Sequence, residues 1–139
     1  MKKPVIIDTN VLVAGFLTAR EFSPVVQILD GMLSAAFPFV VSEALFAEYR
    51  MVLLRDELRK IHGLTGKEID AILIELVRQA IILTPAPAQE APDPGDQHLW
   101  ELLAVRNDLL LVTGDKKLLQ DAGMRGRVIT PKKFIKDLT

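Results

Sequence analysis

Short apolar runs alternate along the chain with longer segments whose apolar residues recur every three or four positions. The first run, Val5-Ile6-Ile7, is β-branched and has no polar break, which is typical of a strand buried on both faces. Runs of this kind predict strands over residues 5–8, 37–41, 80–83, 109–112 and 128–129. The intervening patterns predict helices up to about residue 18, from 24 to 33, from 43 through 53, from 66 to 77, from 96 to 103, over a short stretch before 123, and from 131 to 138.

Start and stop signals agree with these helices. Ser23-Pro24 combines a capping residue with a proline at the first helical position. Thr65 and Glu68 have the spacing of a capping box, in which each side chain bonds the backbone of the other. Gly63 is expected to end the third helix or its continuation. The prolines between residues 84 and 95 indicate an extended connection.

Strands that alternate with helices predict an α/β fold. We expect three layers, α/β/α, with helices on both faces of a central, mostly parallel sheet of four to five strands and right-handed crossovers. The 139 residues contain no repeat, low-complexity tract or linker, so we expect one domain over residues 1–139. The carboxyl ends of parallel strands meet at one edge of the sheet, where ligands bind in folds of this class.

Acidic residues are concentrated at that predicted edge. Asp8 ends the first strand directly, and Asp115 follows the fourth strand after two intervening residues. Asp96 opens the helix that precedes the fourth strand, and Asp93 lies three residues earlier. Glu48 belongs to the helix that leaves the second strand, on the flank of its apolar face.

Each acid also has a purely structural interpretation. Asp8, Asp96 and Asp115 are good helix caps, as is Asn10, while Asp93-Pro94 is a plausible turn. A solvated helix position would account equally well for Glu48. Taken together these interpretations are weaker, because like charges at one edge are costly unless a proton or a cation neutralises them.

Oxygen ligands without Cys or His favour a hard divalent ion, Mg²⁺ or Mn²⁺. Such a site can activate water and stabilise an in-line displacement at phosphorus. The two histidines, His62 and His98, are interpreted as surface or boundary residues. The chain has neither a glycine-rich phosphate loop nor a serine in a nucleophile elbow.

Composition limits the class of protein. Half of the residues are hydrophobic, a quarter are charged and none is cysteine, which excludes disulfides and thiolate metal sites and favours a reducing, intracellular compartment. We expect no membrane span and no signal peptide. The formal net charge is −1, so a polyanion would need a local basic patch or bound cations. If the third helix continues past Leu54, Arg55 and Arg59 align with Glu48 and form such a patch, although pairing with neighbouring acids explains them equally well.

Five segments in order resemble a PIN domain, and more narrowly the VapC-like toxins of bacterial and archaeal toxin–antitoxin pairs. They are IIDTNVLVAGF, SEALFAEYRMVL, DPGDQHLWELLA, LLLVTGDKKLL and RVITPKKFI. The resemblance covers nearly the whole chain and implies that Asp8, Glu48, Asp96 and Asp115 are the four family acids in chain order. Gly95 departs from the pattern, because an acidic or polar residue is common there.

The resemblance implies a metal-dependent ribonuclease that hydrolyses phosphodiester bonds of RNA. Asp8, Asp96 and Asp115 would hold one or two Mg²⁺ or Mn²⁺ ions, with Glu48 as a ligand or as the residue that orients the attacking water. Asn10 and Thr113 match the polar residues that support these acids, and Asp93 matches an additional acid of the subfamily. A small cognate antitoxin and a second copy of the chain are candidate partners, and the expected location is the cytoplasm.

Two other classes of function remain open at this point. One is a PIN fold without catalysis, kept for binding RNA or a protein partner. The other is an acid-site phosphatase or phosphoreceiver, which also places Asp at strand ends. The second class fits poorly, because Asp8-Thr9-Asn10 has no second acid two residues after the first.

Overall fold

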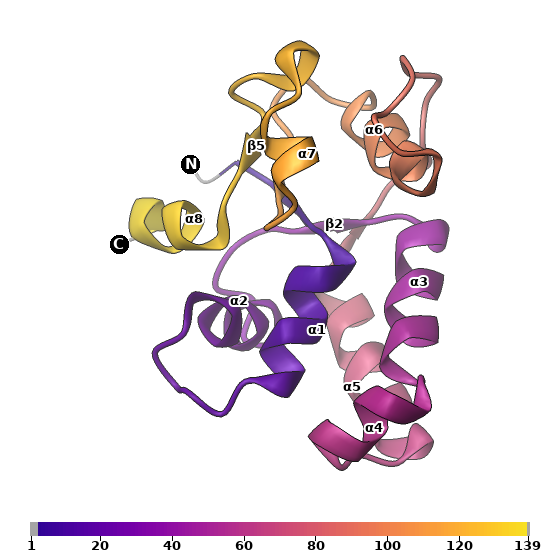
Figure 1. Cartoon of the computed structure of the whole chain (residues 1–139), viewed down its shortest axis with the longest axis vertical. Coiled ribbons are helices and arrows are strands. Elements are labelled where there is room, and N and C mark those ends of the chain that lie inside the picture. The colour runs from indigo at the N-terminus through magenta and orange to yellow at the C-terminus, as the bar shows by residue number, and fades with distance from the viewer. Residues whose placement is uncertain (1–2, 139) are drawn as a thin grey trace.

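The computed structural model describes residues 3–138 (Figure 1). The strands are short: β1 (Val5–Ile7), β2 (Val40–Val41), β3 (Ile81–Ile82), β4 (Leu110–Val112) and β5 (Val128–Ile129). The α-helices are α1 (Thr9–Leu17), α2 (Pro24–Leu33), α3 (Glu43–Leu53), α4 (Asp56–His62), α5 (Gly66–Gln79), α6 (Gln97–Leu103), α7 (Lys116–Leu119) and α8 (Pro131–Leu138). Single 3₁₀ turns cover Pro94–Asp96 and Ala122–Met124.

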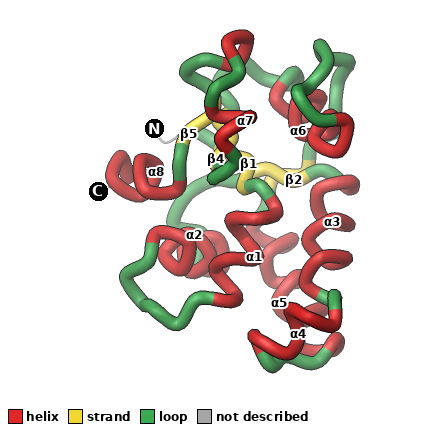
Figure 2. Tube along the Cα trace, viewed as in Figure 1, coloured by secondary structure: helices red, strands yellow, loops and turns green. Residues whose placement is uncertain are grey.

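All strand pairs are parallel, as the alternation of strands and helices predicts. The central strand β4 pairs with β1 on one side and β5 on the other, with Leu111 opposite Ile6 and Val128. Both β1 and β4 consist largely of fully buried residues, and helices surround the strands (Figure 2). The mixed α/β class with a parallel sheet flanked by helices is therefore confirmed.

The predicted strand count is wrong in one respect. The main sheet has three strands, β1, β4 and β5, while β2 and β3 form a separate parallel pair. One bridge, between Val5 and Phe39, joins the two parts, and the Val5 amide donates to the Pro38 carbonyl at 3.2 Å. Pro38 has no amide hydrogen, so the pairing cannot extend before this bridge, and it does not continue after the bridge along β1 and β2.

The alignment of Arg55 and Arg59 with Glu48 required one unbroken helix, and the third helix does not continue that far. Helix α3 ends at Leu53, and Arg55 has extended backbone angles, φ −61° and ψ 135°. A new helix begins at Asp56, where two acidic residues in the first turn complement the positive end of the helix dipole. The alignment of the two arginines with Glu48 is therefore absent.

Most of the predicted helix caps are present. Ser42 accepts a hydrogen bond from the Leu45 amide at 3.2 Å, and Gly63 ends α4 with a positive φ of 69°. The capping box of α5 has both of its hydrogen bonds, between Thr65 and Glu68. Ser23 stands at the cap position of α2 without a side-chain hydrogen bond. Among the described residues, none of the helices combines the length and the apolar character needed to cross a bilayer.

Thr65, which caps α5, and Ser23, at the cap position of α2, allow a matched test of how much a side-chain cap bond contributes to stability. Thr65→Ala removes the hydrogen bond that the Thr65 side chain accepts from the Glu68 amide and leaves the capping box incomplete. We therefore expect it to lower the free energy of unfolding by about 1 kcal/mol. Ser23→Ala removes no cap bond and should change stability much less. Urea unfolding of both variants measures the difference, and equal reductions in stability would contradict the assignment.

Candidate functional site

Asp8 is held at the edge where β1 and β4 end. It is buried, with 6% of its surface exposed, and it occupies the cap position of α1 without making a side-chain cap bond. Its Oδ2 accepts a hydrogen bond of 2.6 Å from the hydroxyl of Thr113, the buried residue that follows β4. The cap interpretation of Asp8 is therefore not supported by its side-chain contacts, which tie it across the sheet to β4.

Thr113 also positions Asp115. The Asp115 amide donates to the Thr113 hydroxyl at 3.0 Å, so one buried hydroxyl contacts both Asp8 and the segment that carries Asp115. The Asp115 carboxylate accepts the Lys117 amide at 2.9 Å and thereby caps α7, as the structural interpretation of this residue expects. The other carboxylate oxygen of Asp115 is not used by this cap.

Asp96 lies at the junction between the 3₁₀ turn and α6, and it makes no side-chain cap bond. Its pKa is raised from 3.8 to about 6, first by burial and then by the charges of Asp8, Asp93, Asp115 and Glu48. Asp93 accepts the Gly95 amide at 2.8 Å, which confirms its role in a turn and places it beside Asp96.

Glu48 faces the site from α3, opposite α6. Its Oε2 lies 2.9 Å from Nε2 of His98, and both side chains are partly buried. The Nδ1 atom of His98 is buried and has no hydrogen-bond partner within residues 3–138. His98 lies at the boundary, as its sequence position predicts, but its contact with Glu48 could not be predicted. The two residues belong to helices far apart in sequence, and no local spacing indicates that α3 and α6 meet.

Tyr49 is a second residue that the sequence did not single out. Its hydroxyl donates a hydrogen bond to the Ile7 carbonyl at the end of β1. Burial, then the charges of Asp8 and Glu48, raise the pKa of Tyr49 well above its ordinary value. Tyr49 thus ties α3 to the end of β1, and the neighbouring Glu48 is close enough to Asp8 for its charge to raise the Asp8 pKa. The one signal for this contact in the sequence is a tyrosine on a buried helix face, because a buried tyrosine hydroxyl needs a hydrogen-bond partner.

The structure brings the four predicted acids within electrostatic reach of one another. Burial raises the pKa of Asp8 above 3.8, the Thr113 hydrogen bond lowers it, and the charges of Glu48 and Asp115 raise it further. Asp96 responds to the same group of charges. Asn10 does not join them, because its exposed side chain makes no hydrogen bond to these acids in the described part of the chain.

This set of donors suits a hydrated hard cation. Within residues 3–138, no three His, Cys, Asp or Glu side chains are arranged to hold an ion by protein ligands alone. Mg²⁺ keeps several of its waters and binds through one or two carboxylates plus substrate phosphate, so it does not require such a group. Asp8 and Asp96 can supply such carboxylates. Burial, together with neighbouring carboxylates, raises the pKa of both.

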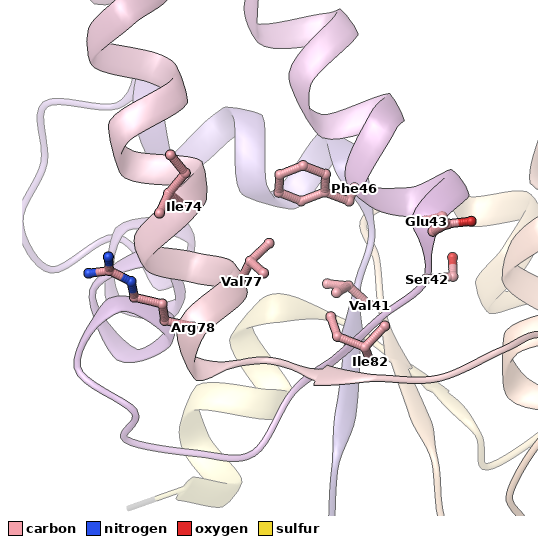
Figure 3. Close-up of a pocket in the computed structure, with 8 residues that line it drawn as sticks. All are labelled: Val41, Ser42, Glu43, Phe46, Ile74, Val77, Arg78 and Ile82. Atoms are coloured by element: carbon pink, nitrogen blue, oxygen red, sulfur yellow. The ribbon is translucent and has the colours of Figure 1, made fainter.

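A separate apolar pocket lies between α3, α5 and the β2–β3 pair (Figure 3). It has a volume of about 320 Å³ and includes Phe46, Val77 and the half-exposed Ile74 and Ile82. Its lining contains none of the four clustered acids. The pocket is therefore distinct from the site at the sheet edge.

Comparison with known proteins identifies the family and the fold. The model of a family described as PIN domain matches residues 4–117. The crystal structure of PAE2754 from Pyrobaculum aerophilum is similar to 98% of this chain and 89% of the other, with a TM-score of 0.65 and 14% sequence identity. At this identity the likeness shows a shared fold. No curated protein is significantly similar to the chain.

The clustered acids predict how stability depends on pH in EDTA. Asp96 has a pKa of about 6 in the folded chain and an ordinary value of 3.8, so the folded state binds its proton more tightly. The resulting stability is fully present below about pH 4 and is lost as the pH rises through about 6. We therefore expect Asp96→Asn to gain stability relative to wild type between pH 4.5 and pH 7.

Urea unfolding at several pH values measures this difference. Asp30→Asn, which removes an exposed charge on α2, is the control for removal of one acid. A difference between Asp96→Asn and wild type that does not change with pH would contradict the electrostatic account of Asp96.

Proposed function

Because the chain belongs to the PIN domain family, we propose that it is a metal-dependent ribonuclease that hydrolyses phosphodiester bonds of RNA. PIN domains are generally nucleases, so family membership suggests a nuclease-type function. The observation that carries the narrower proposal is the group of carboxylates around Asp8. Burial first, and then the charges of this group, raise the pKa of Asp96 to about 6. Placing like charges close together costs free energy unless a bound cation neutralises them.

In this proposal Asp8, Asp96 and Asp115 hold one or two Mg²⁺ or Mn²⁺ ions. The bound metal would lower the pKa of a water molecule and neutralise charge on the phosphate. Glu48 serves as a further ligand or orients the attacking water. Thr113 fixes the Asp8 carboxylate through its hydroxyl, and Asp93 adds negative charge beside Asp96.

Two residues outside the predicted set support Glu48. His98 contacts its carboxylate at 2.9 Å, and Tyr49 anchors the turn of α3 that carries it to the end of β1. Both contacts restrict where the Glu48 carboxylate can lie. A site that must place water in line with a phosphorus atom gains from such restriction.

We also propose the narrower role of a VapC-like toxin with a small antitoxin as partner, acting in the cytoplasm. The order of the acidic motifs along the chain supports this proposal, and a small adjacent reading frame with a DNA-binding fold would test it. The rival proposal is a PIN fold that binds RNA or protein without catalysis. The retention of Asp8, Glu48, Asp96 and Asp115 around one point favours catalysis.

Activity measurements test the proposed ribonuclease directly. We expect wild type to cleave a generic single-stranded RNA in Mn²⁺ and not in EDTA. Asp8→Asn and Asp115→Asn should each lose most of this activity, because they remove a ligand, while melting within a few degrees of wild type. Asp30→Asn, on the surface of α2, should retain it. Full activity in Asp8→Asn, with contaminating nuclease excluded, would refute the assignment.

Metal binding has a readout that needs no substrate. A divalent ion that binds only the folded chain stabilises it, by about 1.4 kcal/mol for 10 mM Mg²⁺ and a Kd on the order of 1 mM. The melting temperature should then rise by roughly 3–6 °C. Asp96→Asn should melt at or above wild type in EDTA, because a repelling charge is gone, yet gain little from Mg²⁺. Melting curves at matched ionic strength measure both effects, and the absence of a shift in wild type would oppose a metal site.

A further inference from the structure

The basic residues of this chain are unevenly distributed. Between residues 116 and 136 there are seven lysines and arginines and one acidic residue, Asp121, although the whole chain has a formal net charge of −1. The remainder of the molecule is therefore strongly acidic. A polyanion is therefore attracted to this segment more than to the rest of the chain taken together.

The topology brings this segment to the same edge of the sheet as the acids. Helix α7 begins directly after Asp115, with Lys116 and Lys117 as its first residues. The Thr113 amide donates to the Ile129 carbonyl at 3.0 Å, so β5 ends beside β4 and α8 starts at the same edge. In Figure 1, α7 lies between α8 on one side and α6, which follows Asp96, on the other.

The lysines of α7 and α8 are exposed on anchored elements. Thr130, Lys132, Lys133 and Lys136 line an open hollow of about 280 Å³. Helix α8 is fixed by the buried Phe134, whose ring packs edge-to-face on Phe37 with centroids 4.9 Å apart. The ion pair between Lys133 and Asp137, at 3.4 Å, is solvent-exposed and therefore weak.

Arg127 is a different case within the same segment. Its guanidinium donates to the backbone carbonyls of Leu103, Arg106 and Leu109, and it is partly buried. This arginine joins β5 to the end of α6 and the start of β4, so its role is structural. The exposed positive charge belongs to Arg125, in the loop before β5, and to five lysines on α7 and α8. We call these lysines the lysine surface: Lys116, Lys117, Lys132, Lys133 and Lys136.

We propose that the lysine surface binds the phosphates of an RNA strand on one side of the bond that is cleaved. This inference rests on the proposed ribonuclease function and specifies how a net acidic protein holds its substrate. The acids repel phosphate, so the strand needs attraction beside them, and α7 and α8 supply it at the same sheet edge. Lysines contact phosphates as point charges, so this surface contributes affinity and orientation without reading base sequence.

Salt-dependent binding tests the lysine surface. The variant is Lys132→Ala with Lys133→Ala, and the control is Lys60→Ala with Lys67→Ala, two exposed lysines of α4 and α5 at the opposite end of the molecule. Binding of a labelled single-stranded RNA is measured in EDTA over a range of salt concentrations. Removing one lysine–phosphate interaction should reduce the slope of log K against log salt by about 0.7, so we expect a reduction of about 1.4 in the α8 variant.

The control variant should keep the wild-type slope, and melting curves check that both variants are folded. Equal slopes for the α8 variant and the control would overturn the inference. Loss of binding to anionic lipid vesicles without loss of RNA binding would overturn it too, because the surface would then serve a membrane.

Cleavage separates this inference from the function it rests on. In Mn²⁺ we expect the α8 variant to raise KM more than it lowers kcat, and to do so more for a long RNA than for a trinucleotide, which offers fewer phosphates to the lysine surface. If wild type cleaves RNA and Asp8→Asn does not, while the α8 variant matches the control, the ribonuclease stands and the lysine surface fails. If wild type cleaves no RNA, the proposed function fails, and the inference that rests on it falls with it.

Discussion

The hydrogen bond from the Thr113 hydroxyl to Asp8 connects the ends of the paired strands β1 and β4 at the point where negative charge accumulates. A buried carboxylate is costly unless it is protonated, hydrogen-bonded or close to a cation. The hydrogen bond from Thr113 offsets part of that cost. The same hydroxyl accepts a hydrogen bond from the Asp115 amide, so the positions of two acids depend on it. The remaining cost appears as the raised pKa of Asp8 and Asp96.

Around that bond, several polar groups lower the stability of the fold while they form the acidic site. Burial and neighbouring charge oppose ionisation of Asp96, and the buried Nδ1 of His98 has no partner within the described residues. Strain of this kind is a common feature of functional sites, and it has to be offset by the rest of the fold. Here the offset comes from the fully apolar β1 and β4 and from the anchored helices around them.

The features that sequence predicted well are those with local signals. The buried run before Asp8, the capping box of Thr65 and Glu68, and the strand followed by Thr113 each follow from neighbouring residues. The features it missed are contacts between distant elements, such as Glu48 with His98 and Tyr49 with the Ile7 carbonyl. The division of the sheet was also missed, because two-residue strands leave their pairing to the surrounding packing.

The order of the strands in the sheet has a consequence for biosynthesis. The central strand β4 is synthesised long after its neighbour β1, because Thr113 follows Asp8 by 105 residues. Until residues 110–113 have been synthesised, Asp8 has no threonine to bond and β1 has no β4 beside it. Contacts of such long sequence separation form slowly, after local structure. A nascent chain that stalls or is degraded before this point therefore lacks the bond between Thr113 and Asp8 and the assembled cluster of acids.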